Sequence, residues 1–167
     1  MVTSIKGNDI STFGGNVDVT GNVVTDAPAF SVYLTSNFSH SAGAWTVVPF
    51  DAEYFDTNSY YDTSTYRFTP TVEGYYQFNI SLGTIHTGTA TIIGAGIWKN
   101  NGLGNQTHLM ASYISHSSGD VKSMSCLTYM NGTTDFINGY VFNNGTSPSV
   151  AAAVQETHMS GYLARAV

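Results

Sequence analysis

The stretch from Tyr66 to Leu82, which reads YRFTPTVEGYYQFNISL, decides the fold of this chain. Pro70 and Gly74 bound a turn, and beyond Gly74 apolar side chains stand at every second position. These positions are Tyr76, Phe78, Ile80 and Leu82. Successive side chains of a strand point to opposite faces. The alternation therefore predicts a half-buried β-strand that is entered through a turn.

The composition favours an all-β protein. Charged residues are only 10% of the 167 residues, against about a quarter in an average globular domain, and Ser, Thr, Asn and Gly take their place. Such a chain is poor in helix formers and rich in strand and turn formers. The net charge is -6 with five Lys and Arg, so nucleic acid is excluded as a partner, because phosphate binding needs clustered cations.

Further strands are expected on both sides of the central one, separated by turns rich in Asn, Gly and Ser. The predicted segments are 29–35, 45–50, 90–99, 109–114, 121–130, 135–143 and 150–154. The segment 90–99 is apolar without alternation, which is typical of a strand covered on both faces. Residues 51–65 are rich in Asp, Tyr, Ser and Thr, and this pattern predicts a long loop.

Five short motifs follow one another in an order that resembles the globular C1q head. They are Pro49-Phe50-Asp51, Tyr60-Tyr61-Asp62, Phe68-Thr69-Pro70, Gly74-Tyr75-Tyr76-Gln77-Phe78 and Met159-Ser160-Gly161-Tyr162-Leu163. The resemblance to this family, which belongs to the C1q/tumour necrosis factor (TNF) superfamily, covers about Pro28 to Leu163. It implies a jelly-roll sandwich of about ten strands that assembles as a homotrimer and serves as a binding or structural module. Its implied core residues are Phe50, Phe68, Gly74, Tyr76, Phe78 and Gly161.

Residues 1–27 differ from the domain that we expect over residues 28–167. Gly-Asn-Val occurs twice, at Gly15-Asn16-Val17 and Gly21-Asn22-Val23, and valines alternate with polar residues. This pattern predicts a short β ribbon, which cannot bury its apolar face alone and needs a partner. The alternative is a disordered tail. Similar repeats are common in bacteriophage fibre and spike proteins. The predicted partner-binding residues of this arm are Ile5, Ile10, Phe13, Val17, Val19 and Val23.

The segment from Asp135 to Asn143 is apolar on both faces. In a two-sheet sandwich one face of a strand meets the core, so the second apolar face predicts contact with another subunit. The sequence does not tell which face is which. The candidates for the trimer interface are Phe136, Tyr140 and Phe142 on one face and Ile137 and Val141 on the other.

Candidate catalytic and metal-binding residues are few. Asp51, Glu53, Asp56 and Asp62 could hold calcium or act as paired acids, but a solvated acidic loop is the simpler interpretation. The five histidines show no ligand spacing. Cys126 lies in an apolar run, which predicts a buried thiol. We therefore expect neither an enzyme nor a cofactor or metal.

The combined features favour a virion structural protein, namely a trimeric decoration (cement) protein on a bacteriophage capsid whose arm binds the major capsid protein. One alternative is the receptor-binding tip of a tail or head fibre, which would bind a host surface receptor or glycan. A second is a secreted C1q/TNF-like ligand or lectin. Residues 1–29 lack the apolar core of a signal peptide, and no apolar run approaches about 18 residues. We therefore expect synthesis in the host cytoplasm and no membrane partner.

Overall fold

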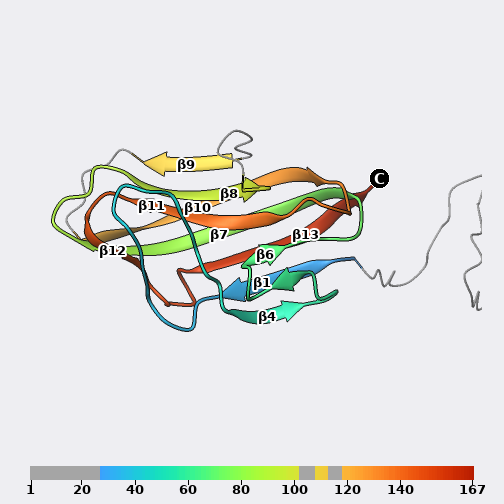
Figure 1. Ribbon diagram of the computed structural model, residues 1–167, viewed down its shortest axis with the longest axis horizontal. Coiled ribbons are helices and arrows are strands. Elements are labelled where there is room, and N and C mark those ends of the chain that lie inside the picture. Colours follow the sequence, from blue (N-terminus) through green and yellow to red (C-terminus); the bar gives the residue numbers. More distant parts are fainter. Residues whose placement is uncertain (1–26, 102–107, 113–117) are drawn as a thin grey trace, which may run out of the picture.

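The computed structural model describes residues 27–101, 108–112 and 118–167, with the backbone alone for residues 108–112. These ranges hold thirteen β-strands, which pair antiparallel in two sheets that pack face to face (Figure 1). The architecture confirms the predicted C1q/TNF-like jelly roll. Short strands in which Tyr, Phe, Ile, Val and Thr alternate with polar residues favour this arrangement, because each strand has one face to bury.

The seven-stranded sheet is built around one long strand, β7, which spans Gly74–Thr87. The other members are β1 (Ala29–Tyr33), β2 (Phe38–Ser39), β4 (Ala52–Asp56), β10 (Gly119–Met130), β12 (Thr146–Val150) and β13 (His158–Ala166). Strand β10 pairs with one edge of β7 over residues 74–85. The opposite edge is shared, because β13 pairs with residues 74–81 and β12 pairs with residues 84–87. Strands β1 and β4 continue the sheet beyond β13.

The six-stranded sheet covers the inner face of the first. Its strands are β3 (Thr46–Val47), β5 (Tyr61–Asp62), β6 (Arg67–Phe68), β8 (Ile93–Lys99), β9 (His108–Ser112) and β11 (Ile137–Asn143). The order is β5-β6-β11-β8-β9, and β3 also pairs with β11. Strands β8 and β11 form the longest ladder of this sheet, from Ile137 opposite Lys99 to Asn143 opposite Ile93.

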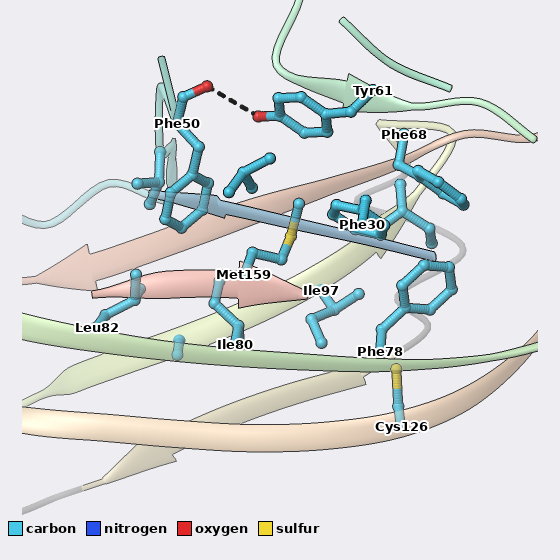
Figure 2. Packing of buried hydrophobic residues seen from close by; sticks show 14 of the residues in the cluster. Phe30, Phe50, Tyr61, Phe68, Phe78, Ile80, Leu82, Ile97, Cys126 and Met159 are labelled. Atoms are coloured by element: carbon cyan, nitrogen blue, oxygen red, sulfur yellow. Dashed lines mark hydrogen bonds between the residues drawn. The ribbon is translucent and has the colours of Figure 1, made fainter. Parts of the chain in front are cut away.

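The core lies between the two sheets and is rich in aromatic rings (Figure 2). The Phe30 ring stacks on Phe68 with 4.2 Å between the ring centroids, and the Tyr61 hydroxyl donates a hydrogen bond of 3.1 Å to the Phe50 carbonyl. Each fully buried apolar side chain of this size stabilises the fold by about 1.5–3 kcal/mol. The alternating residues of β7 are at most 1% exposed, as predicted: Tyr76, Phe78, Ile80 and Leu82.

All six core residues implied by the family resemblance are buried. Gly161 shows why one of them must be glycine. A Cβ atom at this position would lie 2.6 Å from Phe78 Cδ1 and 2.8 Å from Phe30 Cε1. These contacts are too close, so the two core rings can pack against β13 only where the side chain is absent.

Three sequence predictions were wrong in detail. The predicted strand 45–50 is a strand only at Thr46–Val47. The predicted loop 51–65 contains the edge strand β4 and the short strand β5. The predicted strand 150–154 instead ends at Val150, and residues 154–156 form a turn. β12 and β13 both run antiparallel to β7 and follow one another along the same edge, so the chain leaves that edge after Val150 and returns to it at His158. Neither pairing can be seen in the local pattern.

Candidate functional site: an exposed aromatic face

The outer face of the seven-stranded sheet carries large apolar side chains that the chain leaves open to solvent. We call Tyr75, Leu127, Tyr129 and Tyr162 the aromatic face; their exposed fractions are 43%, 55%, 37% and 50%. The pairing register brings these side chains together. Tyr129 stands opposite Tyr75, while Leu127 and Tyr162 flank Gln77 from either side. They occupy the positions that alternate with the buried side chains of the same strands, so they point away from the core.

The four side chains form a continuous surface. The rings of Tyr75 and Tyr129 meet edge to face with 5.6 Å between their centroids. An open hollow of about 370 Å³ is lined by Tyr75, Leu127, Ala164 and Arg165. Exposed apolar residues that gather in this way mark an interaction surface, whereas single ones need no explanation.

Tyr129 is held in place from three sides. Its hydroxyl donates a hydrogen bond to the Glu73 carboxylate, which raises the pKa of Tyr129. Lys99 Nζ lies 5.5 Å from the centre of the Tyr129 ring and donates a hydrogen bond of 2.7 Å to its carbonyl. Lys99 also forms an ion pair of 2.6 Å with Asp135. Because Lys99 belongs to β8 and Tyr129 to β10, this group links the two sheets beside the aromatic face.

Asp135 holds the Lys99 ammonium beside Tyr129 through the ion pair described above. Burial by itself raises the pKa of this carboxyl, but hydrogen bonds from Lys99, Asn100 and the Asn131 backbone outweigh that effect and leave the pKa below its usual value. The carboxylate therefore stays ionised well below neutral pH, and the Lys99 ammonium keeps its partner.

The interface candidates predicted on β11 lie elsewhere, in the six-stranded sheet. Ile137 and Val141 are fully buried in the core of the chain itself, so they cannot also face a second subunit. Tyr140 is 7% exposed and stacks on Trp98 at 3.9 Å. Much of the second apolar face of β11 is therefore covered within the chain.

The remaining two candidates are partly buried by neighbours in the same chain. The Phe142 ring lies 5.4 Å from the ring of Trp45, and the Arg67 guanidinium carbon lies 4.1 Å above the Phe136 ring. The sequence analysis did not name the aromatic face as an interface. The sequence signal that could have marked it is the same period of two: Tyr75, Leu127, Tyr129 and Tyr162 are large apolar side chains at positions that alternate with the core positions of their strands.

The acidic residues of the predicted loop do not converge. Asp51 accepts hydrogen bonds from the Thr35 hydroxyl and backbone at 2.5 and 2.8 Å, and Asp56 accepts one from the Tyr61 backbone at 2.6 Å. Hydrogen bonds from Ser64 and Thr65 lower the pKa of Asp62 to about 2. Asp56 and Asp62 thus stabilise local turns, while Asp51 joins the start of β4 to the segment that follows β1. Among the residues that the structure describes, no three His, Cys, Asp or Glu side chains are placed to hold a metal ion.

Two further exposed aromatics lie on the edge strand β4. Tyr54 and Phe55 are 56% and 50% exposed, and the Tyr54 ring lies 4.5 Å from that of Tyr33. The pairing of β1 with β4 shifts by one residue between Ser31 and Val32. A bulge of this kind leaves one extra residue and turns two successive side chains to the same side. The predicted arm residues, from Ile5 to Val23, lie outside the described part of the chain.

Cys126 is on the inner face of β10 and is 6% exposed, which confirms the predicted buried thiol. Burial raises its pKa. Such a thiol is a poor nucleophile, because the reactive form is the thiolate. The described residues contain no helix long and apolar enough to span a bilayer.

The two-sheet sandwich with its open aromatic face defines the class of protein as a C1q/TNF-like jelly roll. Residues 29–163 match the C1q domain family. The chain therefore belongs to this family, whose domains are generally binding modules without enzymatic activity.

Solved structures agree with the family assignment. The globular domain of zebrafish complement 1qA protein is 16% identical, with a TM-score of 0.59 over 84% of this chain and 99% of that one. Murine APRIL at pH 8.0 is 11% identical, with a TM-score of 0.57 over 82% and 98% of the two chains. At these identities the likeness shows the fold alone. No curated protein sequence gave a match.

Proposed function

We propose that this chain is a non-enzymatic virion structural protein, a homotrimeric decoration protein of a bacteriophage capsid. The observation that carries the assembly is the aromatic face, since a monomer would leave four large apolar side chains on one sheet open to solvent. A second and a third copy of the chain are the partners that fit, because C1q/TNF-like domains typically form homotrimers. Threefold closure buries the same surface once in each copy and leaves none open.

The position of the face suits a closed trimer. Strand β10 pairs with β7 alone in the seven-stranded sheet, and it carries Leu127 and Tyr129. An edge strand beside an apolar face has both unpaired backbone groups and exposed apolar side chains. Both favour burial of this strand against a neighbouring copy of the chain. Leu127 has the largest exposed fraction of the four side chains, so we expect it to change its relative exposure the most on assembly.

Attachment to a capsid is supported by the residues before the domain. The repeated Gly-Asn-Val of residues 1–27 is similar to the repeats of phage fibres and spikes, and 10% charged residues in the whole chain is low for a globular protein. Ala29, where β1 begins, stands opposite Tyr162 of the aromatic face, and the C-terminal end lies at the same end of the sandwich (Figure 1). In a trimer closed by this face, three arms would enter from one end and could grip one surface together.

The receptor-binding tip of a fibre is the second candidate. The exposed Tyr54 and Phe55 favour it, because they form a separate aromatic patch on the edge strand β4 that a host receptor or glycan could contact. Tyr and Phe supply large contact areas at low entropic cost. A decoration protein has no need for this second patch.

The assembly is tested by light scattering of the purified chain. We expect a mass of about three times 17.9 kDa. Leu127→Lys should give a folded monomer, because it places three charges in the buried interface. Val154→Lys is the matched control, since Val154 is 38% exposed and lies away from the aromatic face, and it should remain trimeric. A wild-type monomer at micromolar concentration would refute the assembly.

The attachment is tested by adding the wild-type trimer to undecorated phage heads and to host cells in parallel. A decoration protein should bind heads in many copies and protect them from heat by mass action. A variant lacking residues 1–27 should stay trimeric and lose head binding. Binding to cells without binding to heads would reject the capsid assignment in favour of the fibre tip, and Tyr54→Ala should then weaken cell binding.

A further inference from the structure

Three side chains form a row across the outer face of the six-stranded sheet. Trp98 of β8 stands opposite Asn138 of β11. Ile137 stands opposite Phe68 of β6, so the antiparallel register places Arg67 beside Asn138 on the other edge of β11. We call Trp98, Asn138 and Arg67 the polar row. It joins three neighbouring strands.

Each member of the polar row has one buried polar atom that lacks a hydrogen-bond partner among the described residues. The atoms are Trp98 Nε1, Asn138 Oδ1 and Arg67 Nε. Trp98 and Asn138 are 2% and 1% exposed. Buried polar groups are almost always paired, because leaving one unpaired is costly. Three such atoms in one row therefore indicate a shared partner.

The three atoms cannot easily turn elsewhere. Asn138 Nδ2 donates a hydrogen bond of 2.7 Å to the Tyr66 carbonyl, which can only accept, so the amide orientation is fixed and Oδ1 is the unpaired atom. The Trp98 ring is stacked on Tyr140 at 3.9 Å. The Arg67 guanidinium lies over the Phe136 ring at 4.1 Å. The row thus presents two N–H donors and one carbonyl acceptor in set positions.

We propose that the polar row holds one structural water molecule. Its oxygen accepts hydrogen bonds from Trp98 Nε1 and Arg67 Nε, and one of its hydrogens is donated to Asn138 Oδ1. Water offers two acceptor and two donor sites, and buried waters typically make about three hydrogen bonds. A side chain from another subunit is a poorer fit, because the three atoms are already closed off from solvent within one chain.

The water gives β6 a firm attachment. Strand β6 has two residues and a single paired position with β11, Ile137 opposite Phe68. A water bonded to Arg67, Asn138 and Trp98 extends that attachment across β11 to β8. It thereby holds Phe68, whose ring is in the core, and the Tyr66 backbone, which has a φ of 59°.

The test uses the wild-type protein in a high-resolution crystal structure. We expect an ordered water at about 2.7–3.2 Å from all three atoms. Density for the three side chains as described here without a water between them would overturn the proposal. So would a rearrangement in which Trp98 Nε1 donates directly to Asn138 Oδ1.

Solution NMR gives an independent readout. The chain has two tryptophans, so the spectrum holds two indole N–H signals, and the Trp45→Phe variant assigns them. The Trp98 indole proton should show a persistent cross-peak to a bound water. Trp98→Phe, which removes the donor, should lower the melting temperature more than Trp45→Phe, which removes the same group from the same aromatic cluster. Equal shifts, or no cross-peak, would contradict a water at this site.

Discussion

Both sheets carry aromatic side chains on their outer faces, but only one of these faces is covered by the chain itself. On the six-stranded sheet, Trp98 and Tyr140 stack on each other and are 2% and 7% exposed. On the seven-stranded sheet, Tyr75 and Tyr162 remain about half exposed. An outward apolar face is therefore not in itself an oligomer interface. It becomes a candidate only where no other segment of the same chain packs on it.

The sequence of β8 explains why aromatic rings can cover the outer face of the six-stranded sheet. Strand β8 places Gly94 opposite Phe142 and Gly96 opposite Tyr140. A glycine leaves the surface of the sheet free, so an aromatic ring from the neighbouring strand can lie across it. Trp45, from the segment before β3, closes the cluster at 5.6 Å from Trp98. The seven-stranded sheet has no such segment over Tyr75 and Tyr162 among the described residues.

The largest expected effect separates these two faces directly. Trp98→Ala should cost about 3–5 kcal/mol of unfolding free energy, because it empties a buried site. Tyr162→Ala should cost the folded protomer less than about 1 kcal/mol, since the side chain is half exposed. Denaturant titrations at low protein concentration measure both. Equal losses would mean that the two faces are equally buried.

The second prediction concerns the protein concentration. If the aromatic face is buried between copies, the thermal midpoint of the wild-type protein should rise with concentration, because assembly stabilises the folded state by mass action. The midpoint of Leu127→Lys should stay constant. Scanning calorimetry over a wide concentration range is the measurement. A constant wild-type midpoint would place the aromatic face in solvent.

The third prediction concerns the ion pair of Lys99 with Asp135, which lies where the two sheets are linked. We expect a smaller loss of unfolding free energy here than at Trp98. The folded pKa of Asp135 lies below its usual value. Its contribution is therefore fully present above the unfolded pKa of about 3.9 and is lost as the pH falls through the lower folded pKa. Asp135→Asn should cost about 1.5–3 kcal/mol at pH 7 and should flatten the acid limb of the stability curve. Identical acid limbs in both proteins would exclude this role.

The smallest effect is expected at Cys126, which shares β10 with the aromatic face but points inward. Its raised pKa and its burial predict slow alkylation in the native protein and fast alkylation in denaturant. Cys126→Ala should change the unfolding free energy by about 1 kcal/mol. Fast alkylation of the native thiol would show that the inward face of β10 opens readily.

The sequence was sufficient for the features that depend on neighbours along one strand. Alternation gave the buried side of β7 from Tyr76 to Leu82, and the spaced motifs gave the family. The sequence did not show which of the two outer sheet faces stays exposed in the folded chain. Tyr140 and Tyr75 look alike in their local patterns, and the difference comes from Trp45 and Trp98, which are far away in the chain. The β4 strand was missed for the same reason, since its partner β1 is distant in the sequence. The β5 strand pairs with the nearby β6 and was missed because its two residues are too few to show alternation.

The pairing of β7 determines when the domain can fold during its synthesis. All three strands that pair with β7 come after it, and the last of them, β13, ends at Ala166. The first strand, β1, also waits for β13, which pairs with it from Ala29 to Tyr33. Contacts this distant in sequence make folding slow. A ribosome that releases the chain at Thr157 would therefore yield a polypeptide in which β7 and β1 lack the strand that joins them. The domain should fold only once its final strand has left the exit tunnel.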